Sequence, residues 1–408
     1  RAVNTPAHAD DRFGWRGDRC ACNPAPMDLR TLLDDRAGES HATYARGINP
    51  QFVKVLRTIG FDRDWVRTSG AHLFDAEGSR YLDLLGGFGM FNVGRNNERV
   101  RDALIQALEL EVPNAIQLGV SPLPGLLAEA LIARAPAGIG KVLFTSSGTE
   151  AVEAALKMGR AASRRPRVLS ADHGFHGLTM GSLSLNGNSE FTSRFGPLLP
   201  GFDRVPWNDL EAMERELARE DVGLVVLEPV QGKGLHLPAP GYLEGVQALC
   251  RRYGTLFCVD EVQTGLGRTG KMFAVEHYGI EPDIICMAKG IASGFPFAAL
   301  GTRRELDDKW PTGSHGGTYG GNSMGCAAAL ATIEIMSDPA FLENVNARGK
   351  QLQAGIRELQ REHDVIAQVR GLGLMVGTEF HDAARVAAIT KHCFEEGRLI
   401  LMNAGTYG

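Results

Sequence analysis

The chain has 408 residues and a formal net charge of −5, since 43 Lys and Arg stand against 48 Asp and Glu. This length predicts two or three domains, and the nearly balanced charge argues against a nucleic-acid-binding protein. A hydrophobic fraction of 44% and a charged fraction of 22% are typical of a globular protein, and no run approaches the roughly 20 apolar residues of a membrane span. The 50 glycines follow no Gly-x-y repeat, so they indicate sharp turns or close backbone approach to a ligand.

Both ends of the chain are unusual. Residues 1–26 are polar and contain several prolines, which predicts a disordered arm or linker rather than a signal peptide. A strand is predicted at 399–402, close to the last residue, so we expect a truncated C-terminal part and a chain that belongs to a larger multidomain polypeptide. Seven mostly scattered cysteines, with only Cys20 and Cys22 close together, predict reduced thiols, a cytoplasmic protein and no metal site.

The middle of the chain alternates short apolar runs with helical patterns. An amphipathic helix is predicted at 97–110, and further helices are predicted at 151–163, 210–219 and 242–253. The β-rich runs lie at 142–145, 168–170, 224–227, 256–259, 284–287 and 298–301. This rhythm predicts an α/β domain over 96–335, with a mostly parallel sheet covered by helices on both faces.

The rest of the chain predicts a second, smaller domain. A long helical pattern covers 340–361, and the alternation over 369–380 predicts a hairpin. We therefore expect segments 27–95 and 336–408 to form an α+β domain assembled from both ends of the chain.

A candidate phosphate site lies in the segment LFTSSGTEAVEAAL, residues 143–156. Here a predicted strand runs into a small-residue turn and a helix begins at once. The start of a helix presents free N–H groups and a positive dipole end, which suit a phosphate. A plain helix cap explains the same residues equally simply.

Two charged residues follow neighbouring predicted strands. Asp260 and Glu261 end the strand in LFCVDEVQTGLGRTG, and Lys289 follows the strand in DIICMAKG. Ligands of open α/β sheets bind outside this carboxyl edge, although Glu261 suits a surface position equally well. A lysine flanked by apolar residues can be desolvated, which lowers its pKa and makes its amine a usable nucleophile. Together with the phosphate turn, this set is what pyridoxal phosphate chemistry requires.

Residues 45–408 resemble the class III aminotransferases, the ornithine, acetylornithine, 4-aminobutyrate and putrescine type. The signature that carries the resemblance is LFCVDEVQTGLGRTGKMFAVEHYGIEPDIICMAKGIASGFPFAA. It implies a fold type I pyridoxal phosphate enzyme with a seven-stranded, mostly parallel sheet. It also implies that Lys289 holds the cofactor aldehyde as a Schiff base and that Asp260 pairs with the pyridine nitrogen.

The resemblance also implies the remaining cofactor contacts. Phe175, in HGFHG, matches the aromatic residue that stacks on the cofactor ring, and His176 follows it. Gln263 would lie near the phenolic oxygen. The phosphate turn matches Ser147, Gly148 and Thr149. Thr318, in HGGTYGGN, would reach the phosphate bound in another subunit, which predicts a homodimer or a higher oligomer.

Candidate substrate residues come from two segments. In GGFGMFN, Phe88, Met90 and Phe91 resemble the lip of the substrate pocket, and ordinary packing is an equal alternative. In LEPVQGKG, Glu228 is a further candidate, and Lys233 stands where ornithine and 4-aminobutyrate enzymes usually carry Glu.

The sequence thus predicts a pyridoxal-phosphate-dependent aminotransferase. It would move an amino group from an ω-amine, diamine or amino-acid donor to a 2-oxo acid or aldehyde in a ping-pong cycle, with no nucleic-acid or membrane partner. An aminomutase or decarboxylase of the same fold and a catalytically inactive interaction domain remain as alternatives. A dinucleotide-binding dehydrogenase is disfavoured, because no G-x-G-x-x-G follows a predicted strand.

Overall fold

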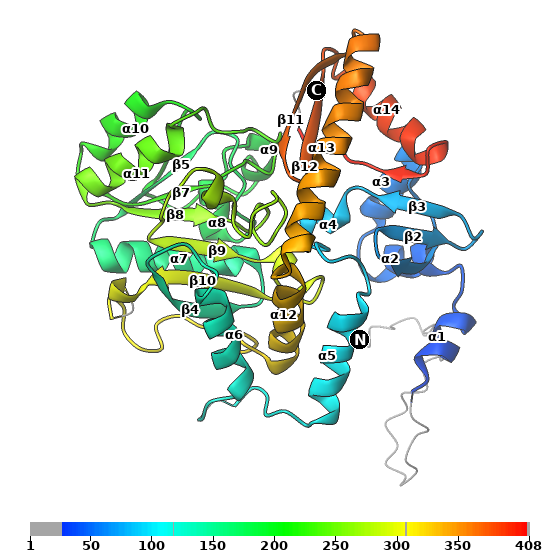
Figure 1. Ribbon diagram of the computed structural model, residues 1–408, viewed down its shortest axis with the longest axis horizontal. Coiled ribbons are helices and arrows are strands. Elements are labelled where there is room, and N and C mark those ends of the chain that lie inside the picture. Colours follow the sequence, from blue (N-terminus) through cyan, green and yellow to red (C-terminus); the bar gives the residue numbers. More distant parts are fainter. Residues whose placement is uncertain (1–26, 117, 307, 406–408) are drawn as a thin grey trace, which may run out of the picture. The chain divides into compact units, whose positions relative to one another are not determined.

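The computed structural model describes residues 27–405 except 117 and 307, so the predicted arm over 1–26, with Cys20 and Cys22, lies outside the described residues. The chain divides into two compact units, 1–58 and 59–408. The first unit contains the helices α1 (Leu29–Asp35) and α2 (Ser40–Gly47), and α3 (Pro50–Ile59) ends at the boundary (Figure 1). In α1, Asp28 caps the first turn by accepting a hydrogen bond from the Arg30 backbone N–H at 3.0 Å.

A seven-stranded sheet forms the centre of the second unit. Its order is β4-β10-β9-β8-β7-β5-β6. Neighbours from β6 to β9 are parallel, and β10 runs antiparallel to both β9 and β4. The predicted mostly parallel, seven-stranded sheet is therefore confirmed. Its strands are β4 (Ile139–Thr145), β5 (Arg167–Ala171), β6 (Phe202–Val205), β7 (Val222–Leu227), β8 (Leu256–Asp260), β9 (Ile284–Met287) and β10 (Ala298–Arg303).

Helices cover both faces of this sheet, as predicted (Figure 1). Side chains alternate along a strand, so Leu224 and Val226 of β7 pack into one core with α7, while Val225 and Leu227 pack into another with α10, α11 and α12. The helices are α5 (Glu98–Glu109), α6 (Pro122–Ile132), α7 (Gly148–Ser163), α8 (Met180–Leu185), α9 (Ser189–Thr192), α10 (Leu210–Leu217), α11 (Tyr242–Tyr253) and α12 (Ser323–Met336). Short 3₁₀ turns lie at η1 (Ala274–His277), η2 (Lys289–Ala292) and η3 (Arg304–Leu306).

Both ends of the second unit meet in a smaller sheet. Strand β13 (Leu399–Ile400) pairs in parallel with β3 (Arg80–Asp83). On its other side β3 pairs with β2 (His72–Asp75), and β2 pairs with β1 (Trp65–Ser69). The core of this sheet contains Leu73, Tyr81, Phe394 and Ile400. The remaining elements are α4 (Gly86–Gly89), α13 (Pro339–Glu362), the hairpin β11 (Ile366–Leu372) with β12 (Met375–Phe380), and α14 (Ala384–Glu395). Segments 65–83 and 399–400 thus share one small sheet, whereas the domains predicted at 27–95, 96–335 and 336–408 stay predictions.

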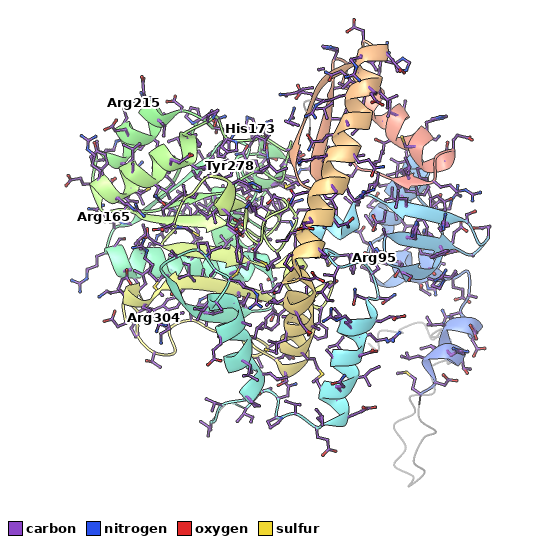
Figure 2. All side chains as sticks on the ribbon, in the orientation of Figure 1. Arg95, Arg165, His173, Arg215, Tyr278 and Arg304 are labelled. Carbon is purple, nitrogen blue, oxygen red and sulfur yellow. The ribbon has the colours of Figure 1, made fainter. Side chains whose placement is uncertain are left out.

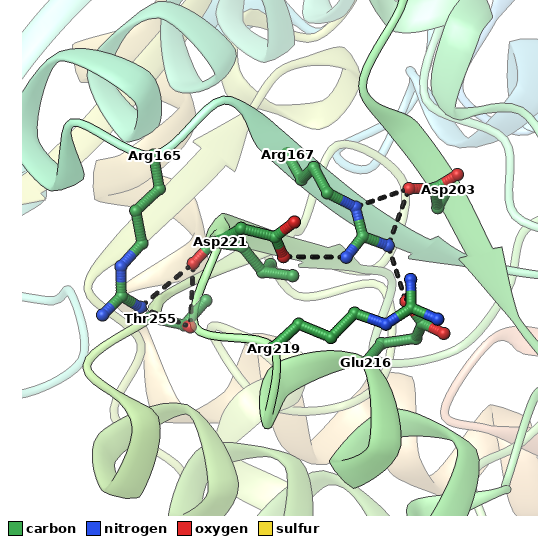
Figure 3. Close-up of polar contacts among 8 residues, drawn as sticks. Arg165, Arg167, Asp203, Glu216, Arg219, Asp221 and Thr255 are labelled. Carbon is green, nitrogen blue, oxygen red and sulfur yellow. Dashed lines mark hydrogen bonds and ion pairs between the residues drawn. The ribbon is translucent and has the colours of Figure 1, made fainter.

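An ion-pair network fixes the amino edge of the large sheet (Figure 3). Arg167, at the start of β5, donates to Asp203 at 2.8 Å, to Asp221 at 2.8 Å and to Glu216 at 2.6 Å. These partners belong to β6, the turn before β7 and α10. The network ties three elements together at the edge opposite the carboxyl ends of the strands.

No single described helix is both long and apolar enough to cross a bilayer; α12 and α13 meet the length and composition test only as a pair, bent by 72°.

Candidate active site

A cavity of about 380 Å³ lies at the carboxyl ends of β7, β8 and β9. Nine of the predicted site residues line it: Ser147, Gly148, Thr149, Phe175, His176, Glu228, Asp260, Gln263 and Lys289. They come from five segments that are far apart in the sequence. The parallel strands bring these segments together because their carboxyl ends share one edge of the sheet.

Asp260 and His176 form a buried pair in the wall of the cavity. Asp260 ends β8, and its Oδ2 lies 2.9 Å from His176 Nδ1, while its Oδ1 accepts a hydrogen bond from the Val262 backbone N–H at 3.0 Å. The His176 backbone N–H in turn donates to Asn186 Oδ1 at 2.8 Å. Burial disfavours the charged imidazole, but the hydrogen bond to Asp260 and the negative charges of Asp260 and Glu228 together outweigh it, so the pKa of His176 is raised. The orientation of the Asp260 carboxylate is therefore fixed by the His176 imidazole and the Val262 backbone N–H.

Lys289 enters the cavity directly after β9. Burial lowers the pKa of its amine, as does the nearby positive charge of Arg268, while the charges of Asp260 and Glu228 oppose this shift. Among the described residues, none forms a hydrogen bond or ion pair with the amine. A desolvated lysine that is free of partners can act as a nucleophile.

The first turn of α7 forms the opposite wall. Ser147 is its N-cap, and its hydroxyl accepts from the Glu150 backbone N–H at 3.5 Å. A Cβ at Gly148 would lie 2.9 Å from Val262 Cγ1, so only glycine lets the helix start this close to the strand ends. The Thr149 hydroxyl is within 2.6 Å of Ser182 Oγ. The first N–H groups of the helix have no intrahelical partner and are available to an anion.

Glu228 braces the wall that carries Phe175. Its two carboxylate oxygens accept from the backbone N–H groups of Phe175 at 2.9 Å and Gly232 at 2.8 Å. Burial raises the pKa of Glu228 to about 7, opposed by the charge of His176. Because both oxygens are already engaged, the structure gives Glu228 a supporting position, and its predicted role toward substrate stays a prediction.

Phe175 is held on its other side by a row of contacts. Its ring meets the Phe191 ring edge-on at a centroid distance of 5.0 Å. The Lys233 ammonium lies 5.5 Å from the Phe191 ring and 2.8 Å from Glu190 Oε1. Lys233 therefore packs behind the aromatic wall instead of lining the cavity.

Three predicted residues do not line this cavity. Thr318 lines a second cavity of about 540 Å³, between residues 115–125 and 317–322. Phe88 is 51% exposed. Phe91 packs under the guanidinium of Arg95, 4.0 Å from its ring centroid; Arg95 is labelled in Figure 2. Of the predicted lip, only Met90 faces the site, and the roles of the other three residues remain predictions.

The sequence did not predict the cavity residues 294–297, and it left a surface position open for Glu261. Glu261, which the sequence also allowed at the surface, is fully buried and accepts from the Val275 backbone N–H at 2.8 Å. The surface alternative was therefore wrong. The stretch GFPF, which continues the recognised signature, could have identified the missed wall residues Gly294, Phe295, Pro296 and Phe297.

Comparisons with known proteins agree with this geometry. The family model for class III aminotransferases matches residues 59–406. Over 362 residues the chain is 37% identical to Aminotransferase PigE of Serratia sp. (strain ATCC 39006). The aligned region covers 87% of this chain and 42% of that protein. The chain thus spans less than half the length of this curated relative.

Two solved structures illustrate the shared fold. The ornithine aminotransferase from Toxoplasma gondii ME49 is 26% identical, with a TM-score of 0.82 over 92% of this chain and 90% of that one. An amine transaminase from an uncultivated Pseudomonas species, solved in a PLP-bound form, is 29% identical, with a TM-score of 0.76 over 84% and 88%. The predicted resemblance, fold class and cofactor are confirmed. The chain belongs to the class III aminotransferase family of pyridoxal-phosphate-dependent, fold type I transaminases.

Proposed function

We propose that the chain is a transaminase unit that moves an amino group from an amine or amino-acid donor to a 2-oxo acid or aldehyde in a ping-pong cycle. The observation that carries this proposal is that Lys289 and Asp260 meet the start of α7 in one cavity. A nucleophilic amine, a carboxylate and an anion site are the groups that pyridoxal phosphate needs from a protein.

The residues of the cavity fit this cofactor. Asp260 would hold the pyridine nitrogen, Phe175 would face the ring and Gln263 would lie near the phenolic oxygen. The first turn of α7 would receive the phosphate, and the glycine at 148 leaves the space that a Cβ would fill. When bound, pyridoxal phosphate supplies an electron sink that weakens the bond to a proton on the amine-bearing carbon.

The residues of the cavity would have separate roles in the reaction. The lowered pKa of Lys289 keeps a larger share of the amine neutral, so the amine would be able to condense with the aldehyde, with loss of water, and when free would carry a proton to and from the substrate carbon. Asp260, which is hydrogen-bonded to His176, would hold a proton at the pyridine nitrogen. The apolar walls at Met90, Phe295 and Phe297 exclude water and favour a substrate with an apolar part.

A half-reaction screen tests this function. Full-length protein loaded with pyridoxal phosphate is mixed singly with diamines, ω-amino acids, α-amino acids and long-chain amines, and conversion to pyridoxamine phosphate is followed by absorbance. We expect at least one class to convert the cofactor and a carbonyl acceptor to restore it. Release of carbon dioxide without amino transfer would contradict the proposal.

We also propose a homodimer in which Thr318 reaches the partner's site. Large apolar side chains are exposed at or next to the residues that line the cavity of Thr318: Leu118 at 103%, Val120 at 93% and Tyr319 at 71%. Exposed apolar groups gathered in one region favour an interface.

Mixing two inactive variants tests this arrangement. Lys289→Ala and Thr318→Ala chains are combined into mixed dimers, and tight cofactor binding is counted per dimer. If Thr318 acts across the interface, half of the sites in a mixed dimer recover wild-type affinity. No recovery would place Thr318 in its own subunit's site.

For location we propose the cytoplasm, since the described cysteines at 250, 258, 286, 326 and 393 are free thiols. Fractionation of cells followed by titration of the thiols tests this, and oxidised cysteines in an exported fraction would contradict it.

A further inference from the structure

The backbone at Lys289 is held in an unusual conformation. Its φ is +46°, in the left-handed region that residues other than glycine rarely adopt. Such a conformation persists only where the surrounding structure holds it, and it often marks a functional site.

Asn92 lies directly against this turn. A Cβ at Gly290 would be 2.2 Å from Asn92 Nδ2, so the amide occupies the space that a side chain would need there. The same Nδ2 donates to the backbone carbonyl of Leu266 at 2.7 Å. Asn92 Oδ1 accepts a hydrogen bond from Arg268 Nη2. Asn92 thus joins the lysine turn to the loop that follows β8.

Arg268 is an incompletely satisfied buried cation. Its Nε is buried and has no hydrogen-bond partner among the described residues. Burial lowers the pKa of its guanidinium to about 10, opposed by the charge of Asp83. The guanidinium lies under the turn of α4, since a Cβ at Gly86 or at Gly89 would be 3.7 Å from it. A buried donor without a partner destabilises the fold, so packing alone does not explain this residue.

We propose that Arg268 is a positioning residue that acts through Asn92 to hold the strained turn at Lys289. The inference rests on the role of Lys289 proposed above. Without the hydrogen bond from Arg268, Asn92 loses its fixed orientation, and the backbone of 289–290 loses the group packed against it.

The charge of Arg268 adds a second effect on the Lys289 amine. Three charged groups act on this amine: Asp260 from β8 and Glu228 from the end of β7 raise its pKa, while Arg268 lowers it. His176 stands behind Asp260. Removing the positive charge of Arg268 therefore raises the pKa of the amine and reduces the share that is neutral.

Capture of the lysine by pyridoxal phosphate measures both effects without turnover. The full chain is mixed with pyridoxal phosphate across a pH series, reduced with borohydride at timed intervals, and the adduct at Lys289 is quantified by peptide mass spectrometry. The pH midpoint of the capture rate reports the pKa of the amine, and the plateau rate at high pH reports its placement. Circular dichroism checks the fold of each variant.

Three variants and one control separate the two effects. For Arg268→Gln we expect the midpoint to rise and the plateau to fall. Arg268→Lys keeps the positive charge but loses the planar guanidinium group. The pH midpoint should therefore stay at its wild-type value, and the plateau rate should fall. Asn92→Ala should behave in the same way. Arg165→Gln, which removes an arginine bonded to the Tyr253 carbonyl at the opposite edge of the sheet, should change neither value.

Each outcome decides the inference. A folded Arg268→Gln chain with a wild-type plateau would overturn it, whatever its midpoint. If that chain does not fold, a wild-type plateau in Arg268→Lys would overturn it instead. A wild-type chain that gives no adduct at Lys289 would contradict the proposed function, which is a separate failure.

Discussion

At the scale of single residues, the hydrogen bond between Asp260 and His176 fixes the carboxylate proposed to pair with the cofactor. Both side chains are buried, and the carboxylate is fixed from two sides by His176 and the Val262 amide. An Asn at 260 keeps the size of the side chain but loses the charge that holds a proton at the pyridine nitrogen. We expect Asp260→Asn to fold and to bind cofactor, with turnover reduced on the order of a hundredfold or more.

Asp221→Asn is the matched control for this change. Asp221 bonds Arg167 at the opposite edge of the sheet, so its variant loses a charge far from the cavity (Figure 3). Single-turnover rates should separate the two variants. A near-normal rate in Asp260→Asn would remove the electron-sink argument.

Glu261 allows a prediction about stability and pH. Burial raises its pKa to about 7, against hydrogen bonds from Thr264 and the backbone that lower it. The folded chain therefore holds this proton more tightly than the unfolded chain, whose carboxyl titrates near 4.5. Stability from this group is fully present below pH 4.5 and is lost as the pH rises to about 7, with an upper limit of about 3 kcal/mol.

Glu261→Gln tests this prediction. The variant lacks the titrating group, so its free energy of unfolding should fall less between pH 5 and pH 8 than that of the wild type. Urea unfolding at the two pH values measures the difference. Equal pH dependence in both chains would show that the carboxyl titrates normally despite its burial.

At the scale of elements, the start of α7 depends on a close approach to the strand ends. A Cβ at Gly148 would lie 2.9 Å from Val262 Cγ1 and 3.3 Å from Ala288 Cβ. We expect Gly148→Ala to push the first turn away from the cavity and to weaken cofactor binding at least tenfold. Gly355→Ala in α13 meets nothing within 4 Å, so it should leave binding unchanged and stabilise the chain by about 0.5–1 kcal/mol. Equal cofactor affinity in both variants would contradict the argument.

The elements that the sequence predicted are those with strong patterns. Strands β7 and β9 carry no polar side chain, and β8 carries none before Asp260, because both faces of the sheet are covered; the ends of β8 and β9 place Asp260 and Lys289. Strand β6 was missed because it is a half-exposed edge strand, in which Asp203 and Arg204 are exposed. The contacts of Arg268 could not be predicted, because its hydrogen-bond partner Asn92 is 176 residues away in the sequence.

At the scale of the whole molecule, the site is built from one sheet edge, whereas Thr318 and Phe88 lie outside its cavity. Sequence resemblance can assign such residues to a site, but a single chain does not show their contacts. The same holds for substrate choice, because apolar walls restrict the shape and polarity of a substrate without identifying it.

The central claim is that Lys289 is the residue that bonds the cofactor. Purified wild-type chain with pyridoxal phosphate should show visible absorbance, and borohydride should fix the cofactor to the peptide that contains Lys289. The Lys289→Ala chain should fold and give no reduced covalent adduct. An adduct that still forms in the alanine variant, at any lysine in the cavity region, would contradict the account.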